Sequence, residues 1–284
     1  MAADADTAAP SLSVVMPAFQ AGDTIAAQLE TLLEQSDDST ELIVVDNGSA
    51  DATATICAAF ARADPRVRLV RQPLRGAPYA LNHGIAEARS DRIAFCDADD
   101  VVGAGWIDAV RAALGEHAVV TGPLELDRLN DAATANSRGK AWAQELSTFD
   151  GVFSLVPSGN SAFHRDLLTG IGGFDPSWPI GYDLELAYRI WAKGVPVVFE
   201  PAMVVHYRYR ADAGDIWRQA VAMGRVRSHL RHRLRRDGVT SAPGAQWRRW
   251  LWVIRHLRDV ATPTRRAGWL WVAGSRAGEL RGTL

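Results

Sequence analysis

Three carboxylates stand together in the middle of the sequence, directly after a short apolar run. Residues 93–96 have the composition of a buried strand, and Asp97, Asp99 and Asp100 follow it at once. Carboxylates this close repel one another and lose hydration, so a bound cation would stabilise them. Hard divalent ions such as Mg²⁺ take oxygen ligands, often carboxylates together with substrate phosphates. The pattern predicts a metal–diphosphate site at Asp97 and Asp99; the alternative is an acidic turn that caps a helix beginning near Trp106.

A further carboxylate, Asp183, stands where the backbone favours its charge. Leu184, Tyr188 and Trp191 share one face of an expected helix, which puts Asp183 in the first turn. The helix dipole stabilises a negative charge there and keeps the carboxylate ionised.

The first hundred residues predict the scaffold that these carboxylates need. Apolar runs at 11–16, 42–45, 67–70 and 93–96 have the pattern of strands, and helical patterns separate them. Strands that alternate with helices of this length form a parallel sheet with right-handed crossovers. Ligands bind beyond the carboxyl ends of such strands, which is where Asp97 falls. The pattern therefore indicates an α/β fold of the nucleotide-binding type.

Past Asp100 the pattern is less regular. The expected elements are a helix at 106–114, a strand at 118–121, a mobile polar loop at 127–140, a short helix at 142–149 and β-like pieces at 195–199 and 203–205. Glycine-rich segments between them are typical of segments that form binding sites.

Composition limits the class of protein. The 284 residues are 48% hydrophobic, enough for one large α/β domain with an appendage or for two small domains. Cys57 and Cys96 fall in apolar or helical patterns, which predicts buried thiols and no disulfide. Residues 1–10 lack the basic and apolar regions of a signal peptide, which predicts a disordered tail and a cytoplasmic protein. No apolar run is long enough to predict a membrane-spanning helix.

The net charge of −2 conceals two oppositely charged parts. Residues 207–284 carry 17 Arg, no Lys and 5 acidic residues, whereas residues 1–206 carry 14 basic and 28 acidic residues. An amphipathic basic helix is expected at 213–236, and segment 247–260 mixes tryptophan with arginine as interfacial helices do. Anionic lipids of the inner leaflet would attract such a surface. The alternative is a basic helix that packs its tryptophans on the rest of the protein; nucleic-acid binding is not expected, because no recognised motif is present.

Eight motifs, in order, resemble the inverting family 2 glycosyltransferases of GT-A fold. They are VVMPAFQAGDTIAAQLETLLEQ near the start, LIVVDNGSADAT at 42–53, GAPYALNHGIAEA at 76–88, IAFCDADD at 93–100, GNSAFHR at 159–165, GGFD at 172–175, GYDLELAYRIWAKG at 181–194 and VVHY at 204–207. The resemblance implies a GT-A domain at 11–210, with a nucleotide-binding half at 11–100 and an acceptor half at 101–210. Its sheet would be mixed, mainly parallel and flanked by helices, and a basic, Trp/Arg-rich helical region would follow at 211–284.

The resemblance implies a donor site for a nucleotide-diphosphate sugar, with UDP as the first choice and GDP or dTDP as alternatives. Pro17, Ala18 and Gln20 would line the nucleotide pocket. Asp46 would bond the nucleobase imide, and Asp97 would lie near the ribose. For Asp46 the alternative is a simple Asx-turn residue.

The metal and the base are implied in the same way. Asp99 would ligate Mn²⁺ or Mg²⁺ between the diphosphate oxygens, and His206 would complete the metal site, unless it is only structural. An imidazole ligand would favour Mn²⁺. Asp100 is interpreted as a helix-capping or supporting residue. Asp183 would be the general base, with capping of its helix as the alternative.

Two positions depart from the family pattern. Tyr182 stands where members usually carry a glutamate, and it could stack on a sugar or an acceptor instead. Leu81 stands where many members carry an arginine, and Arg71 or Arg75 could supply the missing positive charge.

The acceptor would be a glycan, a lipid-linked glycan or a small molecule. Its pocket would include Asn160 and Tyr182, with Trp178 and Trp142 as candidates for stacking on a sugar; core packing is the alternative for both tryptophans. Two other functions stay open: a sugar-phosphate nucleotidyltransferase and a degenerate nucleotide-sugar-binding or scaffold protein. The first usually carries a glycine-rich basic loop after the first strand, which PAFQAGD is not.

Overall fold

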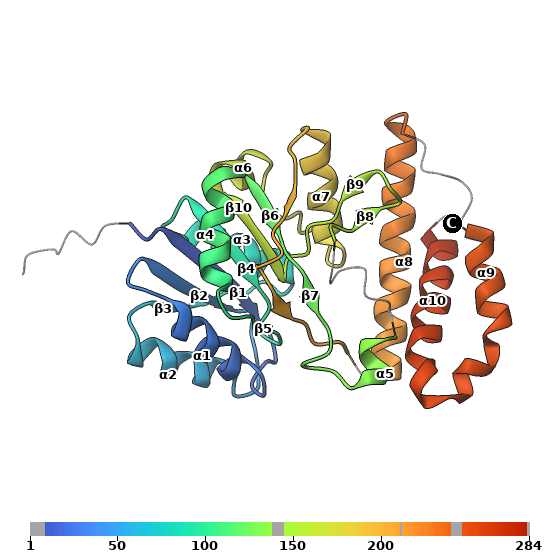
Figure 1. Cartoon of the computed structure of the whole chain (residues 1–284), viewed down its shortest axis with the longest axis horizontal. Helices are drawn as coiled ribbons and strands as arrows, with labels where there is room; N and C mark the ends of the chain where they lie inside the picture. Colours follow the sequence, from blue (N-terminus) through green and yellow to red (C-terminus); the bar gives the residue numbers. More distant parts are fainter. Residues whose placement is uncertain (1–8, 138–144, 211, 240–245, 283–284) are drawn as a thin grey trace, which may run out of the picture.

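The computed structural model describes residues 9–137, 145–210, 212–239 and 246–282. In that part of the chain a seven-stranded sheet carries helices on both faces (Figure 1). Of the tail predicted at 1–10, residues 1–8 lie outside the described residues. Trp142 also lies outside them.

The large sheet contains β1 (Leu12–Ala18), β2 (Thr40–Asp46), β3 (Val67–Arg71), β4 (Arg92–Cys96), β6 (Val119–Thr121), β10 (Asn160–His164) and β11 (Val198–Phe199). The short strands of two smaller sheets are β5 (Val101–Val102), β7 (Leu124–Glu125) and β12 (Val205–His206), and β8 (Thr148–Phe149) with β9 (Phe153–Ser154). The helices before residue 200 are α1 (Ile25–Gln35), α2 (Thr53–Ala63), α3 (Ala77–Glu87), α4 (Trp106–Glu116), α5 (Ala132–Ala135), α6 (Arg165–Gly170) and α7 (Tyr182–Ala192). The later ones are α8 (Ala213–Arg236), α9 (Gln246–Arg255), the 3₁₀ helix η2 (Leu257–Ala261) and α10 (Pro263–Gly282).

The sheet is mixed and mainly parallel, as the sequence predicted. Its order is β11-β6-β10-β4-β1-β2-β3, and β10 runs antiparallel to both neighbours. The other described pairs of this sheet are parallel. Helices between successive strands of the first half return the chain each time in the same direction, which produces parallel pairing.

The strand register aligns the predicted nucleotide-pocket residues. Ala18 at the end of β1 lies opposite Asp46 at the end of β2, and Asp46 lies opposite Arg71 at the end of β3. These residues therefore form one row at the carboxyl edge of the sheet, where α/β proteins bind ligands.

Two cores lie on opposite faces of the sheet, because successive side chains of a strand point to opposite faces. Val14 and Met16 join the core that contains α1 and α4, whereas Val15 joins the core of α3 and α7. Burial on both faces explains why β1 is apolar along most of its length. Cys57 and Cys96 are free and buried, as predicted.

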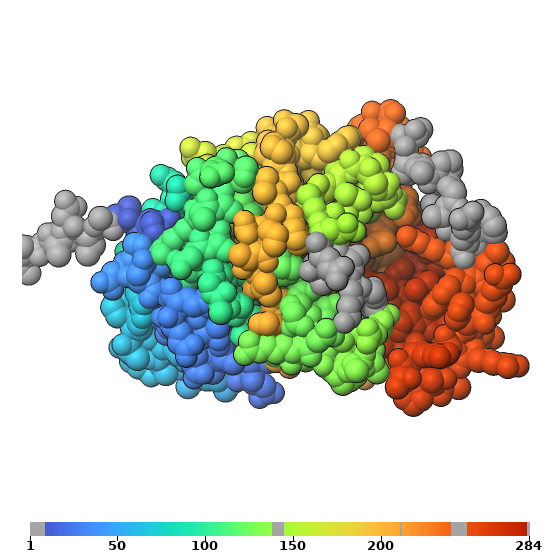
Figure 2. Space-filling model, in the orientation of Figure 1, coloured from blue at the N-terminus to red at the C-terminus, as the bar shows by residue number. Residues whose placement is uncertain are grey.

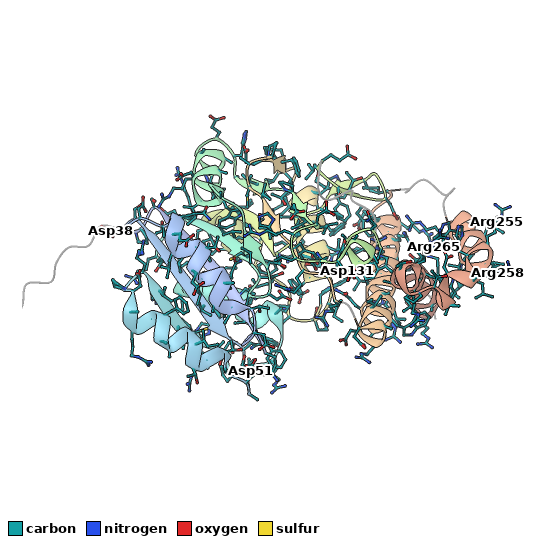
Figure 3. The ribbon with its side chains drawn as sticks, turned by 60° about the horizontal axis from the view of Figure 1, so that its bottom comes forward. Asp38, Asp51, Asp131, Arg255, Arg258 and Arg265 are labelled. Atoms are coloured by element: carbon teal, nitrogen blue, oxygen red, sulfur yellow. The ribbon has the colours of Figure 1, made fainter. Side chains whose placement is uncertain are left out.

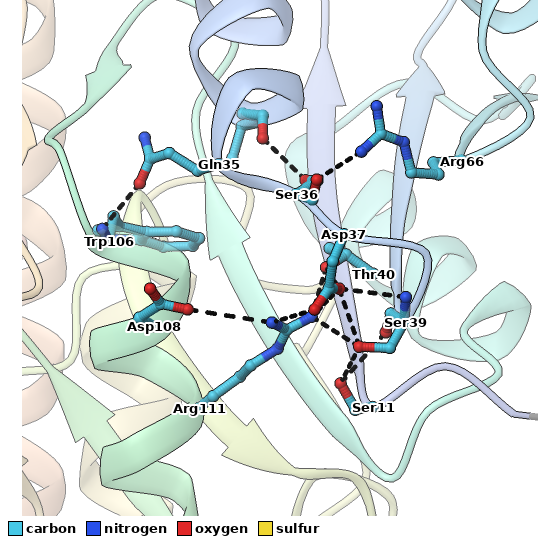
Figure 4. A network of polar contacts seen from close by, with 11 residues as sticks. Ser11, Gln35, Ser36, Asp37, Ser39, Thr40, Arg66, Trp106, Asp108 and Arg111 are labelled. Carbon is cyan, nitrogen blue, oxygen red and sulfur yellow. Dashed lines mark hydrogen bonds and ion pairs between the residues drawn. The ribbon is translucent and has the colours of Figure 1, made fainter.

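A polar network ties the amino-terminal edge of the sheet, opposite the row just described (Figure 4). Arg111 of α4 binds Asp37 at 2.5 Å and donates to Thr40 Oγ1, at the start of β2, at 2.6 Å. Gln35 at the end of α1 accepts a hydrogen bond from the Trp106 amide at 2.9 Å and so fixes the start of α4.

The C-terminal helices form a layer of their own beside the sheet domain, at the end of the molecule away from the blue N-terminal helices (Figure 2). α8 and α10 pack in parallel along a seam of small residues spaced four apart: Ala220, Gly224 and Ser228 face Gly274, Gly278 and Gly282. Small residues let two helix backbones approach closely. The other side of α8 joins the core of α3 and α7, the second core, through Val226, Leu230 and Leu234. Within the described residues, no helix is both long and apolar enough to cross a membrane.

Two local predictions need correction. The loop expected at 127–140 contains α5, because Asp131 caps it by accepting hydrogen bonds from the amides of Ala133 and Thr134. The helix expected at 142–149 ends instead in strand β8, which pairs with β9; residues 142–144 lie outside the described part of the chain.

Candidate active site

The three carboxylates that follow β4 do come together. One oxygen of each of Asp97, Asp99 and Asp100 lies within 4.8 Å of the others. Asp97 is half-buried, Asp99 is exposed and Asp100 is buried. Among the described residues, this is the cluster whose spacing suits a metal ion.

Gln28 of α1 holds the turn that carries these carboxylates. Its side chain is fully buried; Nε2 donates to the Asp97 carbonyl at 3.1 Å and Oε1 accepts from the Val102 amide at 2.9 Å. One amide thus fixes both ends of the acidic turn. The sequence reasoning missed Gln28, because nothing near it in the sequence distinguishes it from other polar helix residues.

Asp100 does not cap α4, so of the two roles that its interpretation allowed, capping was wrong. Gly105 occupies the N-cap position, and Asp100 Oδ1 instead accepts a hydrogen bond from the Arg208 amide at 2.8 Å. Asp100 Oδ2 is buried and has no hydrogen-bond partner among the described residues. A buried carboxylate oxygen without a donor is costly, and a cation would satisfy it.

The electrostatics of the turn favour a bound cation. Burial, followed by the charges of Asp99 and Asp183, raises the pKa of Asp97 to about 7. Burial and the charges of Asp97 and Asp99 raise the pKa of Asp100 well above its usual range. Desolvation also raises the pKa of Asp99, although the charges of Arg210 and Arg208 oppose it. The carboxylates fit a hard divalent ion, because its charge would offset their repulsion and its ligands are oxygens.

Gly159 lets the backbone before β10 lie close against the carboxylates. It precedes β10, whose first residue Asn160 pairs with Cys96 at the end of β4. A Cβ atom at Gly159 would lie 2.5 Å from Asp97 Oδ2, so any larger residue would crowd the acidic turn. The GNSAFHR motif contains this glycine, but the motif alone did not reveal its role.

The loops at the nucleotide edge are cross-linked by side chains. Gln20 Oε1 accepts hydrogen bonds from the amides of Ala50 and Asp51, at 3.0 and 3.2 Å, and so ties the loop after β1 to the loop after β2. Pro17 is half-buried and Ala18 buried at the end of β1. Asp46 is buried and makes the Asx-type contact that was its alternative interpretation, with Oδ1 accepting from the Ser49 amide at 3.1 Å.

Both arginines predicted for this edge are exposed. Arg71 ends β3, and Arg75 lies over the Phe19 ring, 5.1 Å from its centroid. Asn47 anchors the loop that carries Arg75 by donating to the Leu74 carbonyl at 2.7 Å. Leu81, which replaces the family's arginine, is fully buried in the second core.

The sequence did not predict that Arg208 and Arg210 act on the acidic turn. Arg208 Nε donates to the Asp99 carbonyl at 3.0 Å, and both charges lower the pKa of Asp99. The YRYR run that follows His206 was the available signal. Its contact with a turn more than 100 residues earlier depends on β12 pairing with β5.

Asp183 lies in the first turn of α7, as predicted. Gly181 holds the N-cap position with φ of 70°, so capping is not the role of Asp183. Burial raises the pKa of Asp183, and its charge in turn contributes to the raised pKa of Asp97. Tyr182 packs edge-on against Phe174, with ring centroids 5.7 Å apart, and its hydroxyl accepts from Ser158 Oγ at 3.3 Å.

Asn160 does not line a pocket, contrary to the prediction. It is fully buried; Oδ1 accepts from Trp106 Nε1 at 2.9 Å, and Nδ2 donates to the carbonyls of Pro123 and Met203. Its amide is therefore used to join β10 to neighbouring segments and presents nothing to an acceptor.

His206 and Trp178 lie beside other partners. His206 Nδ1 is 2.7 Å from Glu125 Oε2, and the close group of three Asp oxygens does not include His206. Trp178 lines a cavity of about 810 Å³ together with Ile180 and residues of α8, and its ring packs against His229.

Known proteins match both the sequence and the fold. The model of the family described as Glycosyl transferase family 2 matches residues 13–168. The uncharacterized glycosyltransferase YibD of Escherichia coli strain K12 is 40% identical over 91 residues, which are 32% of this chain and 26% of that protein. Matches to curated relatives of this kind span about a quarter to a third of their length.

Two solved structures share the fold across nearly the whole chain. A mannosyltransferase of Pyrobaculum calidifontis, PcManGT, in complex with GDP-Man and Mn²⁺, has a TM-score of 0.67 at 20% identity and covers 98% of this chain and 88% of its own. S. aureus TarS 1–349 in complex with UDP-GlcNAc has a TM-score of 0.56 at 14% identity and covers 95% and 90%. At these identities the likeness concerns the fold.

Proposed function

The chain belongs to glycosyl transferase family 2 and has the GT-A fold, and we propose that it is an inverting glycosyltransferase. It would transfer a sugar from a nucleotide diphosphate to a hydroxyl of a glycan, a lipid-linked glycan or a small molecule. The observation that carries this proposal is the acidic turn Asp97–Asp99–Asp100, which lies at the carboxyl edge of the sheet inside the matched region.

The donor would lie along the row of strand ends. Asp46 and Asp97 would contact the nucleoside, and the charges of Arg208 and Arg75 would face its diphosphate. A divalent ion held by Asp99 and its neighbours would stabilise the negative charge of the leaving diphosphate as a Lewis acid. Two structural neighbours were solved with GDP-Man and with UDP-GlcNAc, which supports a nucleotide sugar here; UDP is our first choice, and GDP or dTDP are alternatives.

Asp183 would act as the general base. Its carboxylate would take the proton of the acceptor hydroxyl while that oxygen attacks the anomeric carbon and the bond to the diphosphate breaks. A raised pKa suits this role, because it makes the carboxylate a stronger base. Tyr182 would border the acceptor, and no covalent intermediate is needed.

Manganese is our first choice of metal. Glu125 orients His206 in the way that carboxylates orient metal-bound histidines, which supports His206 as an additional ligand. An imidazole ligand favours Mn²⁺ over Mg²⁺.

We further propose that α9 contacts an anionic membrane surface. Trp250, Leu251 and Ile254 lie on α9 with exposed fractions of 37%, 40% and 68%. Arg255 at the end of α9 and Arg258 in η2 lie at the outer edge of the C-terminal helices (Figure 3). Apolar side chains bordered by arginines are typical of helices that lie in a lipid interface.

A thermal-shift assay against UDP, GDP and dTDP, each with and without Mn²⁺, tests the donor site. We expect one nucleotide to raise the melting temperature, and only with metal present. At a 100-fold excess of nucleotide over its Kd, the native state would be stabilised by about 2.7 kcal/mol. Asp99→Ala should abolish the shift. Asp91→Ala removes an exposed carboxylate at the other end of β4 and should retain it.

Nucleotide release in the presence of acceptor tests the base. Asp183→Asn should keep the metal-dependent shift and lose turnover by about 10²-fold or more. If Asp183→Asn turns over normally, Asp183 is not the base. If no nucleotide shifts the melting temperature of the wild type, the transferase proposal is refuted; a shift without turnover on any acceptor would favour a degenerate nucleotide-sugar-binding protein.

A further inference from the structure

Away from the acidic turn, α8, α9 and α10 enclose a separate cavity of about 600 Å³. Its wall contains Arg231 and Arg235 of α8, Trp250 of α9, and Arg276 and Glu279 of α10. These residues lie outside the region that the family model matches and outside the proposed donor site.

Two arginines and two carboxylates form a balanced group at this cavity. Arg231 binds Asp150 at 2.5 Å and Glu279 at 2.9 Å. Arg276 binds the same Glu279. These four side chains satisfy one another's charge and fix the positions of both guanidinium groups.

Three further arginines make the surroundings strongly positive. Arg235 lines the cavity, and the charges of Arg227 and Arg249 act on Arg276. The opposing charges that act on Arg227 are those of Asp150 and Glu279, which are already paired. The group therefore has more guanidinium than carboxylate charge.

The buried arginines also carry unused donors. Arg276 is only 2% exposed, and its Nε has no hydrogen-bond partner among the described residues. Arg227 is half-buried, and its Nε has no such partner either. Burial and the neighbouring arginines lower the pKa of Arg276 to about 10, so it remains charged at neutral pH. These Nε atoms have almost no exposed surface, so an anion in the cavity would meet the other guanidinium nitrogens and would offset the surplus of buried positive charge.

We propose that this cavity binds an anion of the phosphate class between Arg235 and Arg276. A guanidinium presents several donors in a rigid plane that matches phosphate oxygens. A tetrahedral phosphate can accept from guanidiniums of α8 and α10 at the same time, whereas a planar carboxylate offers two oxygens. The cavity is larger than one phosphate and leaves room for the group that the phosphate carries.

The phosphate has two possible sources, a soluble phosphate ester and a phospholipid headgroup. Trp250 lines the cavity and is itself 37% exposed beside Leu251 and Ile254. A headgroup could therefore enter the cavity while its acyl chains meet the apolar side of α9. A soluble ester would bind without that apolar contact.

Arg235→Gln and Arg236→Gln form a matched pair for the test. Both residues are exposed arginines in the last turn of α8, and both variants lose one charge. Arg235 lines this cavity, whereas Arg236 lines the cavity on the side of Trp178. Arg276→Gln removes the buried donor; if it does not fold, the matched pair alone decides.

Binding would be measured with full-length protein at constant ionic strength, with EDTA present so that no metal bridges phosphate to the acidic turn. Inorganic phosphate and glycerol 3-phosphate are titrated by calorimetry, and vesicles of phosphatidylcholine with or without phosphatidylglycerol are used in sedimentation. Losing a charge-assisted hydrogen bond should weaken binding about ten-fold in Arg235→Gln and Arg276→Gln, with Arg236→Gln like the wild type.

Each outcome decides the proposal or its source. Weaker phosphate binding in Arg235→Gln than in Arg236→Gln, with unchanged vesicle binding, identifies a soluble ester. Weaker binding to phosphatidylglycerol vesicles in Arg235→Gln than in Arg236→Gln identifies a headgroup. Equal behaviour of the matched pair in both assays, or a wild type that binds neither the soluble phosphates nor the phosphatidylglycerol vesicles, overturns the proposal and leaves the acidic turn and Asp99→Ala results unaffected.

Discussion

Replacing Gly278 by alanine tests how closely α8 and α10 approach each other. A Cβ atom at this position would lie 2.0 Å from the Val221 carbonyl oxygen and 3.0 Å from Gly224 Cα. Carbon and carbonyl oxygen in contact normally stay about 3.3 Å apart or more. The obstacle is backbone, which cannot rotate away, so the two helices would have to separate by roughly 1 Å.

The cost of this separation can be bounded. Overpacking a well-packed contact costs about 1–3 kcal/mol. Alanine would recover up to about 1 kcal/mol, because glycine is the poorer residue in a helix. Because the obstacle is backbone, the cost lies in the upper part of that range, at about 2–3 kcal/mol, and after the recovery we expect Gly278→Ala to lower the free energy of unfolding by about 1–2 kcal/mol.

The displacement should also reach the candidate base. Val226 of α8 packs so closely on Gly181 that a Cβ there would lie 2.4 Å from Val226 Cγ1. Arg233 of α8 also binds Glu185 of α7 at 3.1 Å. A shifted α8 would therefore disturb the first turn of α7, and we expect turnover to fall while nucleotide binding is retained.

Urea denaturation followed by tryptophan fluorescence measures the stability change, because six of the ten tryptophans lie in the C-terminal region. Gly115→Ala is the matched control: it is also a helical glycine, but apart from its chain neighbours and its own helix backbone no described heavy atom lies within 4 Å of its Cβ position. The control should be stabilised by up to about 1 kcal/mol. If Gly278→Ala is stabilised as much as Gly115→Ala, α8 and α10 do not approach in solution as described.

Two further predictions concern pH. Asp183 must be ionised to act as a base, and burial raises its pKa, so kcat/KM should rise with pH through a pKa above about 4, the ordinary carboxyl value. Asp183→Asn should lose this acid limb of the pH profile. An acid limb at or below the ordinary value would contradict the role of Asp183 as the base. At the amino-terminal edge, hydrogen bonds from Arg111 hold the pKa of Asp37 far below its usual range. This pair stabilises the fold above the unfolded pKa of Asp37 and loses its contribution as pH falls through the lower, folded value. Asp37 is half-exposed, so Arg111→Met should lower the free energy of unfolding by about 1 kcal/mol or less at pH 7, as measured by urea denaturation. Nucleotide binding should be unchanged in this variant. Impaired nucleotide binding would contradict the separation of the amino-terminal edge of the sheet from the nucleotide edge.

The sequence alone determined the four strands of the first half, their parallel pairing and the place of the acidic turn, whereas β10 was not predicted. These features depend on short-range patterns: apolar runs such as 42–45 and 93–96 are buried on both faces, and the helices between strands impose direction. Asp97 and Asp99 follow a strand whose carboxyl end faces the ligand edge whatever the rest of the chain does. The order of the motifs added the family, which the family model confirms for residues 13–168.

Only the tertiary structure decided what each polar side chain contacts. Asn160 stands in a motif that suggested a pocket, yet its amide joins three segments of the core. Asp100 suggested a helix cap and instead accepts from Arg208, 108 residues later in the chain. The arginines of α8 were expected on the basic face of an amphipathic helix, whereas packing along the small-residue seam buries Arg231 beside Glu279. Local patterns fix secondary structure because their interactions span a few residues; the partners of a side chain depend on segments that meet only after the sheet and the helices have packed.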